Sequence, residues 1–248
     1  MEVTWDPHTR VREKPRERTD PAFRLLYEDE HIIVVDKAAF VLTVPTLEGE
    51  TDTLVQRIGR YLGKGGPDRR VTVVQRLDRG TSGVMIFAIT EEAATELIDQ
   101  FKRHAPSREY VALVAGVVKD DRGTIASRLA TNKGLSRYST NDEDGERAVT
   151  HYEVEERFPD VTRVRVALET GRRNQIRVHF AEAGHPVLGD VRYRPELARH
   201  PRWRSRRQAL HAAVLGFVHP VTRQRMRFES PLPPEFGAFK AGERKPLR

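Results

Sequence analysis

Cysteine is absent from the 248 residues of the sequence. Disulfide bonds, thiolate chemistry and cysteine-ligated zinc are therefore excluded, and the composition fits a reducing cytoplasm. Long apolar runs are also missing, since no segment approaches the roughly 20 apolar residues of a membrane span. The first residues lack the apolar core of a signal peptide. We expect a soluble, cytoplasmic protein that does not contact a membrane.

Acidic residues are fewer than basic ones. The chain has 36 Asp and Glu against 43 Lys and Arg, which gives a net charge of +7 and a pI of about 9.8. Such an excess attracts a polyanion because binding releases condensed counterions. Nucleic acid is therefore the leading class of partner, and a generally arginine-rich composition is the alternative explanation of the charge.

Strands predominate in the predicted secondary structure. Apolar alternation and β-branched content predict strands at residues 31–36, 71–77, 83–89, 110–118, 149–158, 162–169, 209–218 and 224–229. Helical spacing predicts helices after Asp52, from about Thr90 and after Asn174, with Asp52 and Asn174 as N-caps. Residues 1–21 are predicted to form a flexible basic arm, and the polar residues 131–147 an exposed, turn-rich excursion.

A carboxylate between two arginines is the first candidate for chemistry. Asp78 follows a predicted strand and stands between Arg76 and Arg79, an environment that favours its ionised form. From residue types alone, an ion pair at the end of a strand is the commoner explanation. The motif predicts either a structural pair or a catalytic carboxylate.

Three further segments carry polar side chains near glycines. Tyr110 begins an apolar strand, where core packing is the ordinary role. Arg172, Arg173 and Arg177 surround the start of a predicted helix, which indicates an anion site or a solvated charged turn. The histidines of the segment 210–220 are interpreted as structural, with hydrogen bonds in or near a sheet.

Taken together, these segments resemble the RluA family of pseudouridine synthases. The resemblance extends in order from about residue 25 to 236. It rests on Arg76-Leu77-Asp78-Arg79-Gly80-Thr81-Ser82-Gly83, on the segment 108–116, on Gln175-Ile176-Arg177, and on Val34-Val35-Asp36-Lys37, Gly184-His185-Pro186-Val187-Leu188-Gly189-Asp190 and Ser230-Pro231-Leu232-Pro233.

The resemblance implies an α+β fold and an enzyme. The fold would be a mixed, mainly antiparallel central sheet with flanking helices, forming two subdomains around a basic cleft. Residues 22–240 would be the catalytic domain and residues 241–248 a tail. The reaction would convert uridine in structured ribosomal or transfer RNA to pseudouridine, without a cofactor or metal, and the protein would act as a monomer.

The resemblance also implies roles for particular residues. Asp78 would be the catalytic carboxylate, either as a nucleophile at the ribose or as a base that takes a sugar proton. Arg177 would pair with it, and Tyr110 would pack against the detached uracil. Contacts to RNA phosphates would come from four arginines: Arg76, Arg79, Arg172 and Arg173.

The sequence departs from the family pattern at three places. Gln75 stands where histidine is frequent, Arg173-Asn174 replaces a common threonine-histidine pair, and Ala38-Ala39-Phe40 replaces a turn with proline and glycine. A non-catalytic RNA-binding protein with the same basic cleft is the alternative function. A glycosidase is disfavoured because it needs two catalytic carboxylates and the sequence offers one convincing candidate. A zinc deaminase is excluded because it needs cysteine ligands and the sequence has no cysteine.

Overall fold

The computed structural model describes residues 20–46, 49–63 and 66–239. The predicted tail and nearly all of the predicted N-terminal arm lie outside these residues. Asp20, at the end of that arm, pairs with Arg57 at 3.0 Å and so belongs to the folded part. No helix in these ranges is long and apolar enough to cross a membrane.

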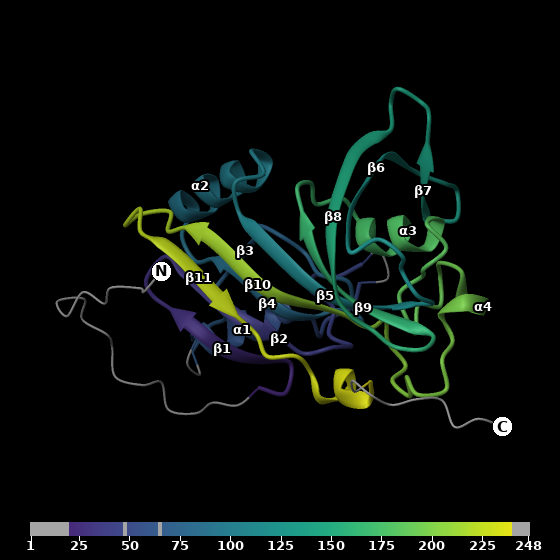
Figure 1. The fold of residues 1–248 in the computed structure, drawn as a ribbon. Helices are drawn as coiled ribbons and strands as arrows, with labels where there is room; N and C mark the ends of the chain where they lie inside the picture. Colours follow the sequence, from purple (N-terminus) through teal and green to yellow (C-terminus); the bar gives the residue numbers. More distant parts are fainter. Residues whose placement is uncertain (1–19, 47–48, 64–65, 240–248) are drawn as a thin grey trace.

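The described residues form one sheet of eleven strands (Figure 1). Its order is β1-β2-β4-β10-β5-β9-β8-β6-β7, with β11 paired to β10 and β3 to β4. The strands are β1 Phe23–Glu28, β2 Ile32–Lys37, β3 Thr72–Val73, β4 Ser82–Ala88, β5 Ser107–Ala115, β6 Arg122–Thr131, β7 Arg137–Thr140, β8 Glu146–Arg157, β9 Val161–Leu168, β10 Leu210–Val218 and β11 Arg225–Glu229. The helices are α1 Leu54–Gly63, α2 Glu91–Lys102, α3 Gln175–Glu182, α4 Pro195–Ala198 and the 3-10 helix η1 Pro234–Ala238.

The sheet is mainly antiparallel, as predicted. β4 and β10 form a parallel pair, while β10 is antiparallel to its other neighbours, β5 and β11. This mixed sheet with few helices confirms the predicted α+β class. Because β10 lies between β4 and β5, the last long strand in the sequence occupies the middle of the sheet.

Helices α1 and α2 cover opposite faces of the half of the sheet that contains β2. Ile33 and Val35 pack in the cluster that includes the apolar face of α1, whereas Ile32 and Val34 pack in the cluster that includes that of α2. All four side chains are fully buried, and burying such a side chain contributes about 1.5–3 kcal/mol. Successive apolar side chains of β2 point to opposite faces of the sheet, and they therefore hold one helix on each face.

The other half of the sheet contains two strands that the sequence pattern did not predict. β6 alternates between partly and fully exposed residues along most of its length, and β7 pairs with it inside the predicted excursion. The prediction of an irregular segment at 131–147 is therefore wrong for β7. Backbone hydrogen bonds hold this strand without an apolar pattern, and the buried side chain of Arg137 donates to the carbonyl oxygen of Leu129.

Two predicted boundaries also need correction. The strand predicted at residues 71–77 is only β3, because the chain leaves the sheet before the Asp78 loop. Thr53, not Asp52, occupies the N-cap of α1: its carbonyl accepts from Arg57 N, and its backbone N donates to the side chain of Gln56. The side chain of Asp52 instead pairs with Arg57 and Arg60.

The loop that carries Asp78, residues 77–81, is anchored through its backbone. The carbonyl oxygen of Leu77 accepts from the Thr43 hydroxyl at 2.9 Å, and that of Asp78 accepts from Thr81 N. The carbonyl of Arg79 accepts from Lys37 and that of Gly80 from Arg207. Four successive carbonyls are therefore bonded, which fixes the path of the loop.

Glycines allow close approach on both sides of this loop. A Cβ at Gly80 would lie 2.2 Å from the side-chain oxygen of Gln208, and one at Gly83 would lie 2.1 Å from the carbonyl oxygen of Ala212. Gly83 also has a φ of 118°, which favours glycine. Close packing against β10 and the segment before it therefore requires glycine at both positions of the motif.

Lys37 supports the loop from the protein interior. It is 1% exposed, and its Nζ donates to the carbonyl oxygens of Ala38 and Val41 at 2.8 Å and of Arg79 at 3.4 Å. Burial and the nearby charge of Arg207 lower the pKa of Lys37 to about 7, while the charge of Asp78 opposes the decrease. Lys37 therefore connects β2 to the Asp78 loop through a buried amine that loses its proton above about pH 7.

Replacing Lys37 by Met is expected to remove a pH dependence of stability. In the unfolded chain a lysine titrates at about 10.4, so above pH 7 the unfolded state binds more protons at this position than the folded state. The wild-type free energy of unfolding should rise with pH from about 7 towards 10, relative to Lys37→Met, by at most about 1.4 kcal/mol per pH unit. Urea denaturation across this window measures the difference. The exposed control Lys119→Met should follow the wild-type profile, and a parallel profile for Lys37→Met would contradict the expectation.

Candidate active site

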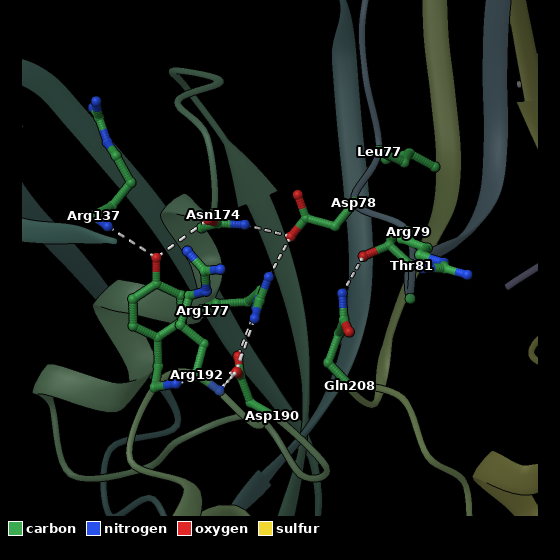
Figure 2. Close-up of polar contacts among 12 residues, drawn as sticks. Leu77, Asp78, Arg79, Thr81, Arg137, Asn174, Arg177, Asp190, Arg192 and Gln208 are labelled. Atoms are coloured by element: carbon green, nitrogen blue, oxygen red, sulfur yellow. Dashed lines mark hydrogen bonds and ion pairs between the residues drawn. The ribbon is translucent and has the colours of Figure 1, made fainter. Parts of the chain in front are cut away.

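Asp78 is held by donors at the start of α3, a helix that contacts β7 and β8 (Figure 2). Arg177 NH1 lies 2.8 Å and Asn174 Nδ2 lies 2.6 Å from the same oxygen, Asp78 Oδ2. Among the described residues, no donor reaches Oδ1. The Asp78 side chain is 28% exposed, so this carboxylate has one fixed oxygen and one that can meet a bound molecule.

Arg177 links two carboxylates. Its Nε and NH2 donate to Asp190 at 2.6 and 2.8 Å, and its NH1 donates to Asp78 (Figure 2). The Asp190 side chain is fully buried. Burial alone would lower the pKa of Arg177, but hydrogen bonds and charges of Asp190 and Asp78 raise it above the ordinary value. The guanidinium is therefore fixed in orientation and charge.

Asn174 corrects a prediction made from the sequence. It does precede α3, but its side chain makes no capping hydrogen bond and its backbone is left-handed, with a φ of 55°. Its amide donates instead to Asp78, and its Oδ1 accepts from the Tyr193 hydroxyl at 3.2 Å. That hydroxyl also accepts from Arg137 N. Asn174 is thus oriented towards Asp78 by contacts on both ends of its amide.

Tyr110 lies on β5 and is 9% exposed. Burial raises the pKa of its phenol, the positive charge of Arg108 opposes this, and the negative charge of Asp78 adds to it. The phenol therefore lies within electrostatic range of the catalytic candidate and is protonated at neutral pH. Of the three residues proposed from the sequence as one site, Asp78 and Arg177 form a direct ion pair.

The four arginines predicted to bind phosphate do not share one partner, although Arg76 and Arg172 line the same cavity. Arg79 donates to the carbonyl of Phe40, Arg172 pairs with Glu146 at 3.1 Å, and Arg173 donates to the carbonyl of Leu135. Arg76 is exposed and lines a cavity beside Tyr110. The guanidinium groups of Arg172, Arg173 and Arg177 each have a different partner, and the anion site expected from these three residues stays a prediction. Asp78 itself pairs with Arg177 of α3 and with neither Arg76 nor Arg79, the arginines that flank it in the sequence.

The histidines of β10 and its following turn are structural, as predicted. His211 Nδ1 lies 2.8 Å from the hydroxyl of Ser82, and His219 Nε2 lies 2.8 Å from Asp29. Burial lowers the pKa of His211. Within the described residues, no group of three or more His, Asp or Glu side chains is arranged to hold a metal ion.

Asp190 and Lys37 were not predicted as parts of the site. Both stand in segments that carried the family resemblance, but their sequence context shows only a glycine before Asp190 and a β-branched run before Lys37. Their importance depends on burial and on partners far away in the sequence. The sequence offered one indication of their importance: each is a charged residue within an apolar segment. Charged side chains are seldom fully buried without a partner.

The comparisons with known proteins agree on one family. The model of the RNA pseudouridylate synthase family matches residues 31–182. The ribosomal large subunit pseudouridine synthase D of Pseudomonas aeruginosa is 40% identical over 227 residues, which cover 88% of this chain and 70% of the relative. The dual-specificity RNA pseudouridine synthase RluA of Pasteurella multocida is 35% identical over 216 residues, which cover 86% of this chain and 94% of the relative.

A solved structure has the same fold. Human RNA pseudouridylate synthase domain containing 1 superposes with a TM-score of 0.69 at 26% identity, covering 88% of this chain and 87% of that one. The region matched by the family model contains the Asp78 loop, Tyr110 and Arg177. The chain therefore belongs to the RluA family of RNA pseudouridine synthases and is an isomerase that converts uridine in RNA to pseudouridine.

Proposed function

We propose that the chain modifies uridines of ribosomal RNA and that Asp78 begins the reaction. One observation carries the role of Asp78: two donors hold Oδ2, while Oδ1 has no donor among the described residues. The names of relatives such as the ribosomal large subunit pseudouridine synthase D support the choice of RNA. Transfer RNA is the other candidate substrate, as the family resemblance implied, and one relative is named as a dual-specificity RNA pseudouridine synthase.

The reaction is an isomerisation, so the product contains the same atoms and electrons as the substrate. The bond from ribose C1′ to uracil N1 breaks, the base turns, and a bond forms from C1′ to C5. The proton on C5 is then lost, and N1 ends with a proton. Asp78 Oδ1 attacks the ribose as a nucleophile or takes a sugar proton as a base, and both routes need an ionised oxygen that faces the substrate.

Arg177 and Asp190 keep the carboxylate ready for either route. Asp190 fixes two of the guanidinium nitrogens of Arg177, so the third points at Asp78. Losing one partner of a buried ion pair leaves the other charge uncompensated, which costs about 3–5 kcal/mol. Arg177 is therefore a positioning residue for Asp78, and Asp190 positions Arg177.

Tyr110 supports the reaction by packing. Its raised pKa keeps the phenol protonated at neutral pH, which favours a contact with the detached uracil over proton removal by a phenolate. The RNA must expose the target base at a cost of a few kcal/mol. Exposed arginines near the site, Arg76 and Arg79, supply phosphate contacts that offset this cost.

Asp78→Asn is expected to abolish turnover because the amide neither attacks the ribose nor accepts a sugar proton. Tritium release from ribosomal RNA labelled at C5 of uridine should fall by roughly a thousandfold or more. RNA binding, measured by fluorescence anisotropy, should persist. Asp120→Asn changes an exposed carboxylate in the same way and should retain wild-type activity. If the wild type binds RNA yet releases no tritium from ribosomal or transfer RNA, the proposed function fails.

Asn174 should affect the chemical step through Asp78. Asn174→Ala removes one hydrogen bond to the carboxylate, and such a bond to a charged group contributes about 1.5–3 kcal/mol. Single-turnover rates at saturating RNA should fall by about ten- to a hundredfold.

Asn174→Asp provides the readout that a purely structural role would not change. Two adjacent carboxylates compete for a proton, so the acid limb of the rate profile should move to higher pH. An unchanged pH profile in Asn174→Asp, with a wild-type rate in Asn174→Ala, would exclude a positioning role.

A further inference from the structure

A polar cavity lies beside Tyr110. It has a volume of about 400 Å³, and Tyr110 forms part of its wall, whereas Asp78 and Arg177 do not. Ile98 and Phe101 of α2 form an apolar side. The polar lining is contributed by six side chains: Gln75, Arg76, Lys102, His104, Arg108 and Arg172.

The lining is cationic. No Asp or Glu is among the residues that form this cavity. Arg172 is paired with Glu146, but no carboxylate pairs with Arg76, Lys102 or Arg108 in the part of the chain that the structure describes. Several positive charges without counter-charges therefore face one small space, and like charges so arranged repel each other. An anionic ligand would relieve this repulsion.

Arg108 gives this cavity the features of a built site. The residue is 8% exposed, and its NH2 donates to the carbonyl of Glu169 at 3.3 Å. Its Nε is buried and has no hydrogen-bond partner. Burial lowers the pKa of Arg108, and no carboxylate is among the groups that oppose this decrease. A buried guanidinium without an acidic partner is costly to maintain.

Gln75 provides a second donor without an acceptor. Its Nε2 is buried and has no partner, although Gln75 lines the same cavity as Arg108. Buried polar groups are normally hydrogen-bonded, so each exception needs an explanation. A ligand that supplied acceptors would explain why both Arg108 Nε and Gln75 Nε2 have no partner within the protein.

We infer that this cavity binds a backbone phosphate of the RNA next to the target uridine. The inference rests on the proposed function, because the cavity shares Tyr110 with the Asp78 cluster and Gln75 lies three residues before Asp78 in the sequence. A phosphate diester offers acceptors and a negative charge but no donor, which matches the lining. The Ile98 and Phe101 side accommodates the sugar or base attached to it.

Arg108→Met tests the inference, since Met keeps an unbranched apolar chain and removes the charge. The affinity for a labelled RNA stem-loop with loop uridines should fall about tenfold, and the slope of log affinity against log salt should decrease by about one. Lys102→Gln, at an exposed position, should change both in the same direction and does not disturb the core. Lys119→Gln, beyond the other end of β5, should leave both unchanged. Thermal melting verifies that each variant is folded.

Two further arms identify the source of the phosphate. A neutral methylphosphonate at one linkage beside the loop uridine should weaken binding by the wild type but not by Arg108→Met. If inorganic phosphate instead raises the melting temperature of the wild type alone and both proteins bind RNA equally, the cavity holds free phosphate and the inference is overturned. Wild-type salt slopes in folded Arg108→Met and Lys102→Gln would also overturn it. These are binding measurements, so an absence of tritium release counts against the proposed function and not against the cavity.

Discussion

The buried charge of Arg177 is the constraint on which the site depends. A guanidinium in the interior needs compensation on more than one side. Asp190 binds two of its nitrogens and Asp78 the third. Asp78 precedes β4 and Arg177 is on α3, which contacts β7 and β8, so the compensation of this one charge joins the two halves of the molecule. Structural stability and the orientation of the catalytic carboxylate thus have the same origin.

Two buried basic side chains contact the backbone of the Asp78 loop. Lys37 and Arg207 are almost fully buried and donate to successive carbonyl oxygens of the loop. Arg207 is in turn paired with Glu235. The loop is therefore fixed by backbone contacts that do not use the Asp78 side chain. Such preorganisation spares the protein a rearrangement during the reaction, and the carboxylate keeps one oxygen for the substrate.

Much of the fold could be predicted because its buried strands carry a strong pattern. β2, β4, β5, β8, β9, β10 and β11 lie close to the predicted positions, and so do α1, α2 and α3. β6 and β7 could not be found in this way, because most of their side chains are polar or exposed and backbone pairing alone defines them. In the site, the motif indicated Asp78, Tyr110 and Arg177. The orientation of Asn174 and the pairing of Asp190 depend on contacts across long sequence separations, which local patterns do not contain.

The position of β10 has a consequence for the order in which the protein assembles. Strands β4 and β5 do not pair with each other, since β10 lies between them and pairs with both. Asp78 precedes β4 and Tyr110 is on β5, yet the strand that brings them together ends only at Val218. Until residues 210–218 pair with them, β4 and β5 therefore each have one open edge. The part of the chain that precedes β10 therefore cannot close the sheet between Asp78 and Tyr110, and the site is complete only once this long-range pairing has formed.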